Sequence, residues 1–120
     1  MIRLKRAYDL PGEQDGFRVL VERLWPRGIT KEKAALDAWL KEAAPSPTLR
    51  SWYAHDLEKW EEFKRRYIHE LQANPEAVHR LKGWIAAHPT VTFVYAAKDE
   101  EHNSALVLRT FLEDPGMGSR

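Results

Sequence analysis

The sequence predicts an α/β fold, with a small, mainly parallel sheet of three to four strands flanked by helices. Short apolar segments that suit strands, at residues 2 to 8, 17 to 24 and 91 to 96, are separated by segments with helical spacing. Strands that alternate with helices favour a parallel sheet. Residues 19 to 21 are apolar without interruption, which is typical of a strand that is covered on both faces.

The length of 120 residues corresponds to one domain, which we place at residues 1 to 113. A short tail follows at residues 114 to 120, which we expect to be poorly ordered. Hydrophobic residues make up 43% of the chain, enough for a core, and no apolar stretch has the length of a signal peptide or a membrane span. We therefore expect a cytoplasmic protein that does not bind membranes.

Charge and cysteine usage exclude several classes of function. Nineteen basic residues against eighteen acidic ones give a net charge of +1, without the basic excess of a protein that neutralises phosphates along nucleic acid. Nucleic acid is therefore an unlikely partner. The chain has no cysteine, so disulfides, thiol nucleophiles and thiolate metal sites are excluded.

The first two predicted strands end in recognisable turns. The strand at residues 2 to 8 alternates apolar and basic residues, and the Pro-Gly and Asp-Gly pairs between residues 11 and 16 mark the loop after it. The second strand runs into the phrase RLWPRG at residues 23 to 28. Pro26 cannot extend a central strand and Gly28 permits a positive φ, so we expect the chain to turn there.

The segment after this turn has two readings. Thr30 is a good N-cap for a helix that starts at Lys31, but the end of that helix is not marked. The apolar residues between 36 and 43 fit helical spacing and also alternate in part, so a short strand over residues 37 to 41 is an alternative. Ser46 followed by Pro47 predicts the start of the next helix.

Three further helices and one strand complete the chain. The clearest helix spans residues 57 to 71, with Asp56 as its N-cap and mixed charges opposite its apolar stripe. Asn74 and Pro75 begin another helix, which ends near residues 88 and 89. The strand at 91 to 96 leads through a polar loop at 98 to 103 into the last helix.

Two charged phrases follow predicted parallel strands, so both belong at the carboxyl edge of the sheet, where such folds bind ligands. If the second and last strands are neighbours, we expect Arg23, Arg27 and Lys98 to converge with the first turn of the last helix and bind an anion such as phosphate or carboxylate. Trp25 would form one wall of this cleft, and His102 would transfer protons. Asp99 is the second catalytic candidate beside His102, and the remaining ligand-binding candidates are Gly28, His55 and Asn103.

A structural reading of the same phrases stays open. Asp99 and the two glutamates after it suit a helix N-terminus, and they would also pair with Arg23 and Arg27 as ion pairs that only stabilise the fold. A metal site built from His55, Asp99 and His102 lacks any typical ligand spacing, so we expect neither a metal nor a cofactor.

Two long phrases carry a resemblance to a known family: VLVERLWPRGITKEKAALDAWLKEAAPSPTLRSWYAHDLEKWEEFKRRYIHEL and VYAAKDEEHNSALVLRTFL. They resemble the YeaO-like branch of the domain-of-unknown-function 488 family (DUF488), over roughly residues 2 to 113. The resemblance implies a compact bacterial or archaeal α/β domain, in which the stretch 37 to 41 would be a strand, and no established activity. Longer relatives carry cysteines around the loop after the late strand, whereas this chain has none, which removes thiol chemistry from that site.

Two functions from different classes follow from these observations. The first is an anion-binding cleft for a phosphorylated or carboxylated small molecule at the carboxyl edge of the sheet, with binding alone and catalysis both compatible with the residues. The alternative is a non-catalytic module that binds a protein or RNA partner through the charged face of the helix at 57 to 71, where Lys64, Arg65 and Arg66 would make the contact. The oligomeric state is not encoded in any pattern that we find.

Overall fold

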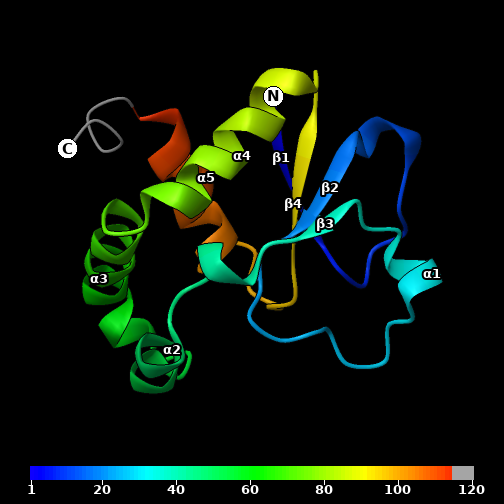
Figure 1. Cartoon of the computed structure of the whole chain (residues 1–120). Helices are drawn as coiled ribbons and strands as arrows, with labels where there is room; N and C mark the ends of the chain where they lie inside the picture. Colours follow the sequence, from blue (N-terminus) through cyan, green and yellow to red (C-terminus); the bar gives the residue numbers. More distant parts are fainter. Residues whose placement is uncertain (115–120) are drawn as a thin grey trace.

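The computed structural model describes residues 1–114 and contains one sheet of four parallel strands (Figure 1). The strands are β1 (Ile2–Arg6), β2 (Phe17–Leu20), β3 (Ala38–Trp39) and β4 (Val91–Tyr95), in the spatial order β1-β4-β2-β3. The predicted α/β class is confirmed, and so is the strand alternative for residues 37 to 41. Apart from Asp114, the predicted tail lies outside the described residues.

Helices connect and cover these strands, and no helix within residues 1–114 has the length and apolar character needed to cross a membrane. The α-helices are α1 (Lys31–Ala34), α2 (Pro47–Tyr53), α3 (Trp60–Gln72), α4 (Pro75–Ala87) and α5 (Ser104–Glu113), with short 3-10 turns at Glu13–Asp15, Lys41–Ala43 and Leu57–Lys59. The predicted N-caps are all confirmed by hydrogen bonds to the first turns: Thr30, Ser46, Asp56 and Asn74. α3 begins three residues later than predicted, because Leu57–Lys59 winds as a 3-10 turn.

The two faces of the sheet carry different layers. Helices α2 to α5 lie on one side of the sheet, where the side chains of Val19, Val21 and Phe93 join the main core (Figure 1). Leu20 and Val94 point to the other face and pack with Trp25 and Leu36 of the long connection between β2 and β3 and with Trp39 of β3. Around residues 19 to 21 both faces of the sheet are therefore covered by apolar side chains, which explains the uninterrupted apolar run in β2.

β2 is shorter than the predicted strand at residues 17 to 24. Its last backbone bond joins the amide of Val21 to the carbonyl of Val94 at 3.1 Å, and the chain then leaves the sheet. The reason lies in Trp25, whose indole packs edge-on against Trp39 with ring centroids 5.4 Å apart and donates to the carbonyl of Ile29. Trp25 is thus drawn over the second face of the sheet.

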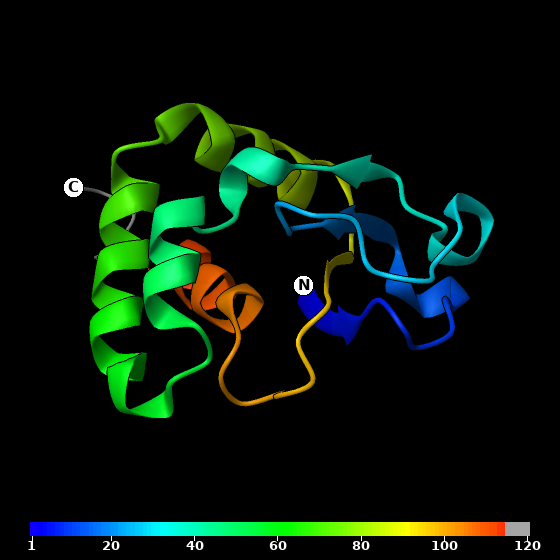
Figure 2. The same ribbon diagram turned by 90° about the horizontal axis from the view of Figure 1, so that it is seen from below.

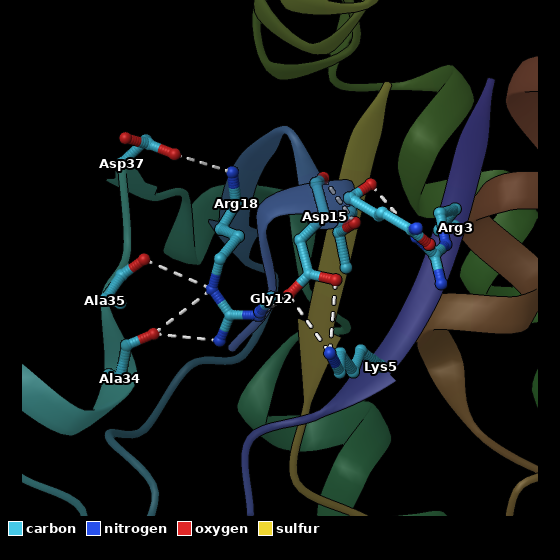
Figure 3. Close-up of polar contacts among 10 residues, drawn as sticks. Arg3, Lys5, Gly12, Asp15, Arg18, Ala34, Ala35 and Asp37 are labelled. Carbon is cyan, nitrogen blue, oxygen red and sulfur yellow. Dashed lines mark hydrogen bonds and ion pairs between the residues drawn. The ribbon is translucent and has the colours of Figure 1, made fainter. Parts of the chain in front are cut away.

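A polar cluster, which we call the Asp15 cluster, lies on the second face and comprises the half-buried Lys5 and the buried Asp15, Arg18 and Thr92, of which Figure 3 labels the first three. The carboxylate of Asp15 accepts from Arg18 Nη1 at 2.6 Å and from Lys5 Nζ at 3.1 Å, and the hydroxyl of Thr92 donates to the carbonyl of Asp15. Burial by itself raises the pKa of Asp15, but the Gly12 amide and the two cations outweigh it, so this pKa is lowered.

The same cluster anchors the connection that follows. Arg18 is only 3% exposed, and its remaining donors reach the carbonyl oxygens of Ala34 and Ala35 at the end of α1. Gly16 completes the arrangement, since its φ of 64° and a Cβ position only 2.2 Å from the carbonyl oxygen of Thr90 exclude any side chain there. The loop before β2 is therefore fixed by both charge pairing and backbone packing.

Candidate functional site

A cavity of about 440 Å³ opens at the carboxyl edge of the sheet, which lies at the bottom of Figure 1 and faces the viewer in Figure 2. The segments that follow β2 and β4, the helix α2 and the first turn of α5 surround it, and α3 contributes Phe63. Its lining residues are Glu22, Pro45, Arg50, Ser51, Tyr53, His55, Phe63, Ala96, Ala97, His102, Asn103 and Ser104. Parallel sheets form clefts at this edge, as the sequence predicts.

Glu22 is the acidic group of the cavity and sits where β2 ends. Its Oε2 atom accepts from the backbone amide of Ala96 at 2.9 Å, which ties it to the end of the neighbouring strand β4. Its Oε1 atom accepts no hydrogen bond from residues 1–114. Burial raises the pKa of Glu22, and the Ala96 amide together with Arg50 and His55 offsets this only in part.

Helix α2 brings Arg50 to the cavity. The helix is held in place by Ser46, whose hydroxyl accepts from the amide of Leu49 and donates to the carboxylate of Glu70 on α3 at 2.6 Å. Arg50 is exposed, and its guanidinium has no hydrogen bond or ion pair within the described part of the chain. Arg50 is therefore a cation whose donors are available to a ligand.

His55 reaches the same cavity through an unusual turn. Ala54 and His55 both adopt left-handed backbone conformations, with φ of 46° and 59°, which non-glycine residues rarely do. The turn folds His55 back over the ring of Tyr53, with ring centroids 6.0 Å apart. Strained backbone of this kind is often found at functional sites.

His102 is the second imidazole of the cavity, and Asp99 orients it. The Nδ1 atom of His102 lies 2.9 Å from Oδ2 of Asp99, and the ring edge meets Trp60 with centroids 5.2 Å apart. The amide of Glu101 donates to Asp99 and is the main reason that the pKa of Asp99 is lowered, with further donors from His102. With Nδ1 bonded to the carboxylate, Nε2 is the nitrogen left for a ligand.

The first turn of α5 closes the site. Asn103 is buried, accepts from the amide of Leu106 at 2.9 Å and donates to the carbonyl of Asp99 at 3.0 Å. The amides of Ser104 and Ala105 have no intrahelical partner, because the first turn of any helix leaves its donors free. These amides give the site a partial positive charge.

The structure brings together some of the predicted site residues. β2 and β4 are neighbours in the sheet, as the anion-site prediction requires. His55, His102 and Asn103 line the cavity, and Asp99 contacts it through His102. The structural reading of the acidic loop as ion pairs with Arg23 and Arg27 is not what is found, since Asp99 bonds to its own loop and to His102.

The predicted basic residues are placed elsewhere. The guanidinium of Arg23 donates to the carbonyl oxygens of Ala44 and Pro45, both at 3.2 Å, so it supports the fold. Trp25 belongs to the second face of the sheet, where it packs against Trp39. Three further predicted site residues are exposed and do not line the cavity: Arg27, Gly28 and Lys98. The predicted convergence of Arg23, Arg27 and Lys98 at the cavity is therefore not observed, because Arg23 bonds to backbone carbonyls and the chain at Trp25 packs over the second face.

Sequence reasoning missed the side chains that do face the cavity. These are Glu22, Arg50, Ser51, Tyr53 and Ser104. Glu22 could have been found, since it follows a buried strand directly at the edge where ligands bind. Arg50 carries no such signal, because its position depends on how α2 packs against α3.

The charged helix face of the alternative prediction is neutralised within α3. Lys64 pairs with Glu61, and Arg65 and Arg66 both pair with Glu62 at 2.6 and 2.9 Å. The two arginine pairs account for the lowered pKa of Glu62. No group of three or more potential metal ligands occurs within residues 1–114.

Fold and site together define a parallel α/β protein with a cavity at the carboxyl edge of its sheet that is lined by charged, polar and apolar side chains. The chain belongs to the DUF488 family: the family model described as "Inactive DUF488-N3 subclade" matches residues 1–117. The resemblance that the sequence phrases suggest is thereby confirmed.

Several curated relatives cover most of the chain. The uncharacterised protein YeaO of Escherichia coli K12 is 41% identical over 111 residues, which span 92% of this chain and 96% of that protein. Uncharacterised proteins of Mycobacterium bovis and Mycobacterium tuberculosis are 37% identical over 111 residues, which span 92% of both chains. No solved structure matches the chain significantly.

Proposed function

We infer that the protein binds a small anionic molecule in the cavity at the carboxyl edge of the sheet. The observation that carries this proposal is the guanidinium of Arg50, which lines the cavity and makes no hydrogen bond or ion pair with the described residues, although its charge acts on Glu22. Arginine donors bind carboxylate and phosphate through charge-assisted hydrogen bonds. The free amides of the first turn of α5 favour the same charge.

Two imidazoles in the cavity could either contact a ligand or transfer protons, and we favour the ligand contact. His55 and His102 line the same cavity as Arg50, and Asp99 holds His102 in one orientation. An oriented imidazole would suit proton transfer, as the sequence predicts for His102. The description of the matching family model as inactive favours a ligand contact over catalysis. We therefore propose a binding protein that acts in the cytoplasm.

The test is anion binding by the wild type and by two arginine variants. Sulfate and phosphate should raise the melting temperature of the wild type, since a ligand that binds only the folded state stabilises it. Arg50→Ala should lose this stabilisation. Arg27→Ala is the matched control, because Arg27 is exposed but lies outside the cavity, and it should respond as the wild type does.

Two results would contradict this proposal. One is a wild type that neither anion stabilises. The other is an Arg50→Ala variant that responds as strongly as the wild type, which would place the anion away from the cavity.

A further inference from the structure

We propose that the ligand of this cavity is amphoteric: besides its anionic group it carries a protonated amine that binds the carboxylate of Glu22. An α-amino acid with an apolar side chain is the simplest molecule of this class. The inference rests on the proposed anion site and adds to it the second charge of the ligand.

The position of Glu22 in the cavity is the reason to expect an amine on the ligand. Its carboxyl group lines the same cavity as Arg50, and one of its oxygens is held by the amide of Ala96 at 2.9 Å. The other oxygen has no donor from residues 1–114. A ligand with an N–H or ammonium group satisfies this acceptor, whereas a ligand without one leaves it unpaired, which costs binding free energy.

The charge of Glu22 also favours a ligand that carries an ammonium group. A simple anion next to Arg50 would share the cavity with the carboxylate of Glu22, and like charges at close range repel each other. An ammonium group on the ligand turns this repulsion into attraction. The cavity therefore discriminates against the plain acid and in favour of the amino acid built on the same skeleton.

The apolar residues that line the cavity indicate which side chain the ligand carries. Tyr53 and Phe63 stack with ring centroids 4.4 Å apart and both line the cavity, together with Pro45 and two alanines. A volume of about 440 Å³ is within the range of pockets for organic ligands and exceeds what an inorganic anion fills. An apolar side chain is the part that these walls fit.

The experiment compares amino acids with the same acids lacking the amine. The probes are phenylalanine with phenylpropanoate and leucine with methylpentanoate, measured by calorimetric titration. The wild type should bind at least one amino acid about tenfold or more tightly than its amine-free partner. Glu22→Gln should reduce this ratio to about one, because the amide keeps the shape and loses the charge.

A control separates this effect from a general change in charge. Glu42 is exposed and does not line the cavity, so Glu42→Gln should keep the preference of the wild type. Arg50→Ala should weaken both members of each pair, since it removes the partner of the carboxylate that they share.

The possible outcomes distinguish the two proposals. Equal affinity of the wild type for both members of each pair overturns the amphoteric ligand, and so does a preference that Glu22→Gln leaves unchanged. If sulfate stabilises the protein through Arg50 while no amino acid binds, the anion site stands and the amphoteric ligand is wrong. If sulfate has no effect either, both proposals fail.

Discussion

The Asp15 cluster and the cavity at the carboxyl edge both collect charged side chains on one sheet, but their partners differ. In the Asp15 cluster, Arg18 and Lys5 bond to Asp15, and the other donors of Arg18 reach backbone carbonyls (Figure 3). In the cavity, Arg50 and one oxygen of Glu22 have no hydrogen-bond or ion-pair partner within residues 1–114.

This difference separates the two uses of charge in the molecule. Charges that are buried and fully hydrogen-bonded hold a structure in one arrangement, and removing one partner leaves the other unpaired at high cost. Charges that face a cavity without a hydrogen-bond partner add little to the stability of the fold and are available to a ligand. Substitutions in the Asp15 cluster should therefore act on stability, and substitutions in the cavity on binding.

The largest effect on stability should come from Asp15→Asn. The change leaves the guanidinium of Arg18, which is 3% exposed, without its anionic partner. We expect the free energy of unfolding to fall by about 3 kcal/mol, as measured by urea denaturation. Glu13→Gln, on the exposed side of the same 3-10 turn, should change it by less than about 0.5 kcal/mol. A similar loss in both variants would remove the distinction between the cluster and the surface.

Gly16→Ala tests the backbone packing beside the same cluster. The new Cβ would lie 2.2 Å from the carbonyl oxygen of Thr90, at a φ of 64° that alanine disfavours. We expect a loss of about 2 kcal/mol in the free energy of unfolding. Gly83→Ala in α4 is the matched control, because a Cβ there meets nothing within 4 Å, and alanine should stabilise the helix by up to about 1 kcal/mol. Two variants with the same sign would contradict this explanation.

The elements of the fold could be predicted from local signals. Side-chain caps at Thr30, Ser46 and Asn74 mark helix starts because the capping residue and the amide it accepts from are neighbours in sequence. The strand at residues 38 and 39 stayed ambiguous, because two residues are too few to separate alternation from helical spacing. From the sequence, β2 and β4 could only be assumed to be neighbours, since their pairing depends on the path of the whole chain.

The candidate site was predicted in its location and only partly in its residues. The edge of the sheet, His55 and His102 follow from strand order and residue chemistry. Arg23 looked equally suitable, but its guanidinium reaches the backbone carbonyls of Ala44 and Pro45. Tertiary contacts decide which cation bonds to the protein itself and which one is available to a ligand. No local sequence pattern encodes this difference.

Asn103→Ala tests a residue that both caps α5 and lines the cavity. Asn103 caps α5 and bonds to the carbonyl of Asp99, so alanine should lower the free energy of unfolding by about 1 kcal/mol. Sulfate binding should weaken as well, since the loop that carries His102 loses an anchor. Asn103→Ser restores the cap and should recover most of the stability. A serine variant as unstable as the alanine variant would show that the cap is not the cause.

The smallest change in stability should come from Glu22→Gln, and its pH dependence should oppose that of Asp15→Asn. Burial raises the pKa of Glu22 above its ordinary value of 4.5, so the folded state holds this proton more tightly than the unfolded state. Its contribution to stability is complete below pH 4.5 and is lost as the pH rises through the folded pKa. Glu22→Gln removes this loss, so the variant should gain on the wild type as the pH rises through that window.

Asp15 has the reverse sign, because its pKa is lowered below 3.8 in the folded state. Its contribution is present above pH 3.8 and is lost as the pH falls through the folded pKa, so Asp15→Asn should approach the wild type only in acid. Urea denaturation of both variants from about pH 3 to about pH 8 measures the two profiles. A Glu22→Gln profile parallel to that of the wild type would mean that the pKa of this carboxyl is the same in the folded and the unfolded state, so that the Ala96 amide, Arg50 and His55 would offset the effect of burial in full.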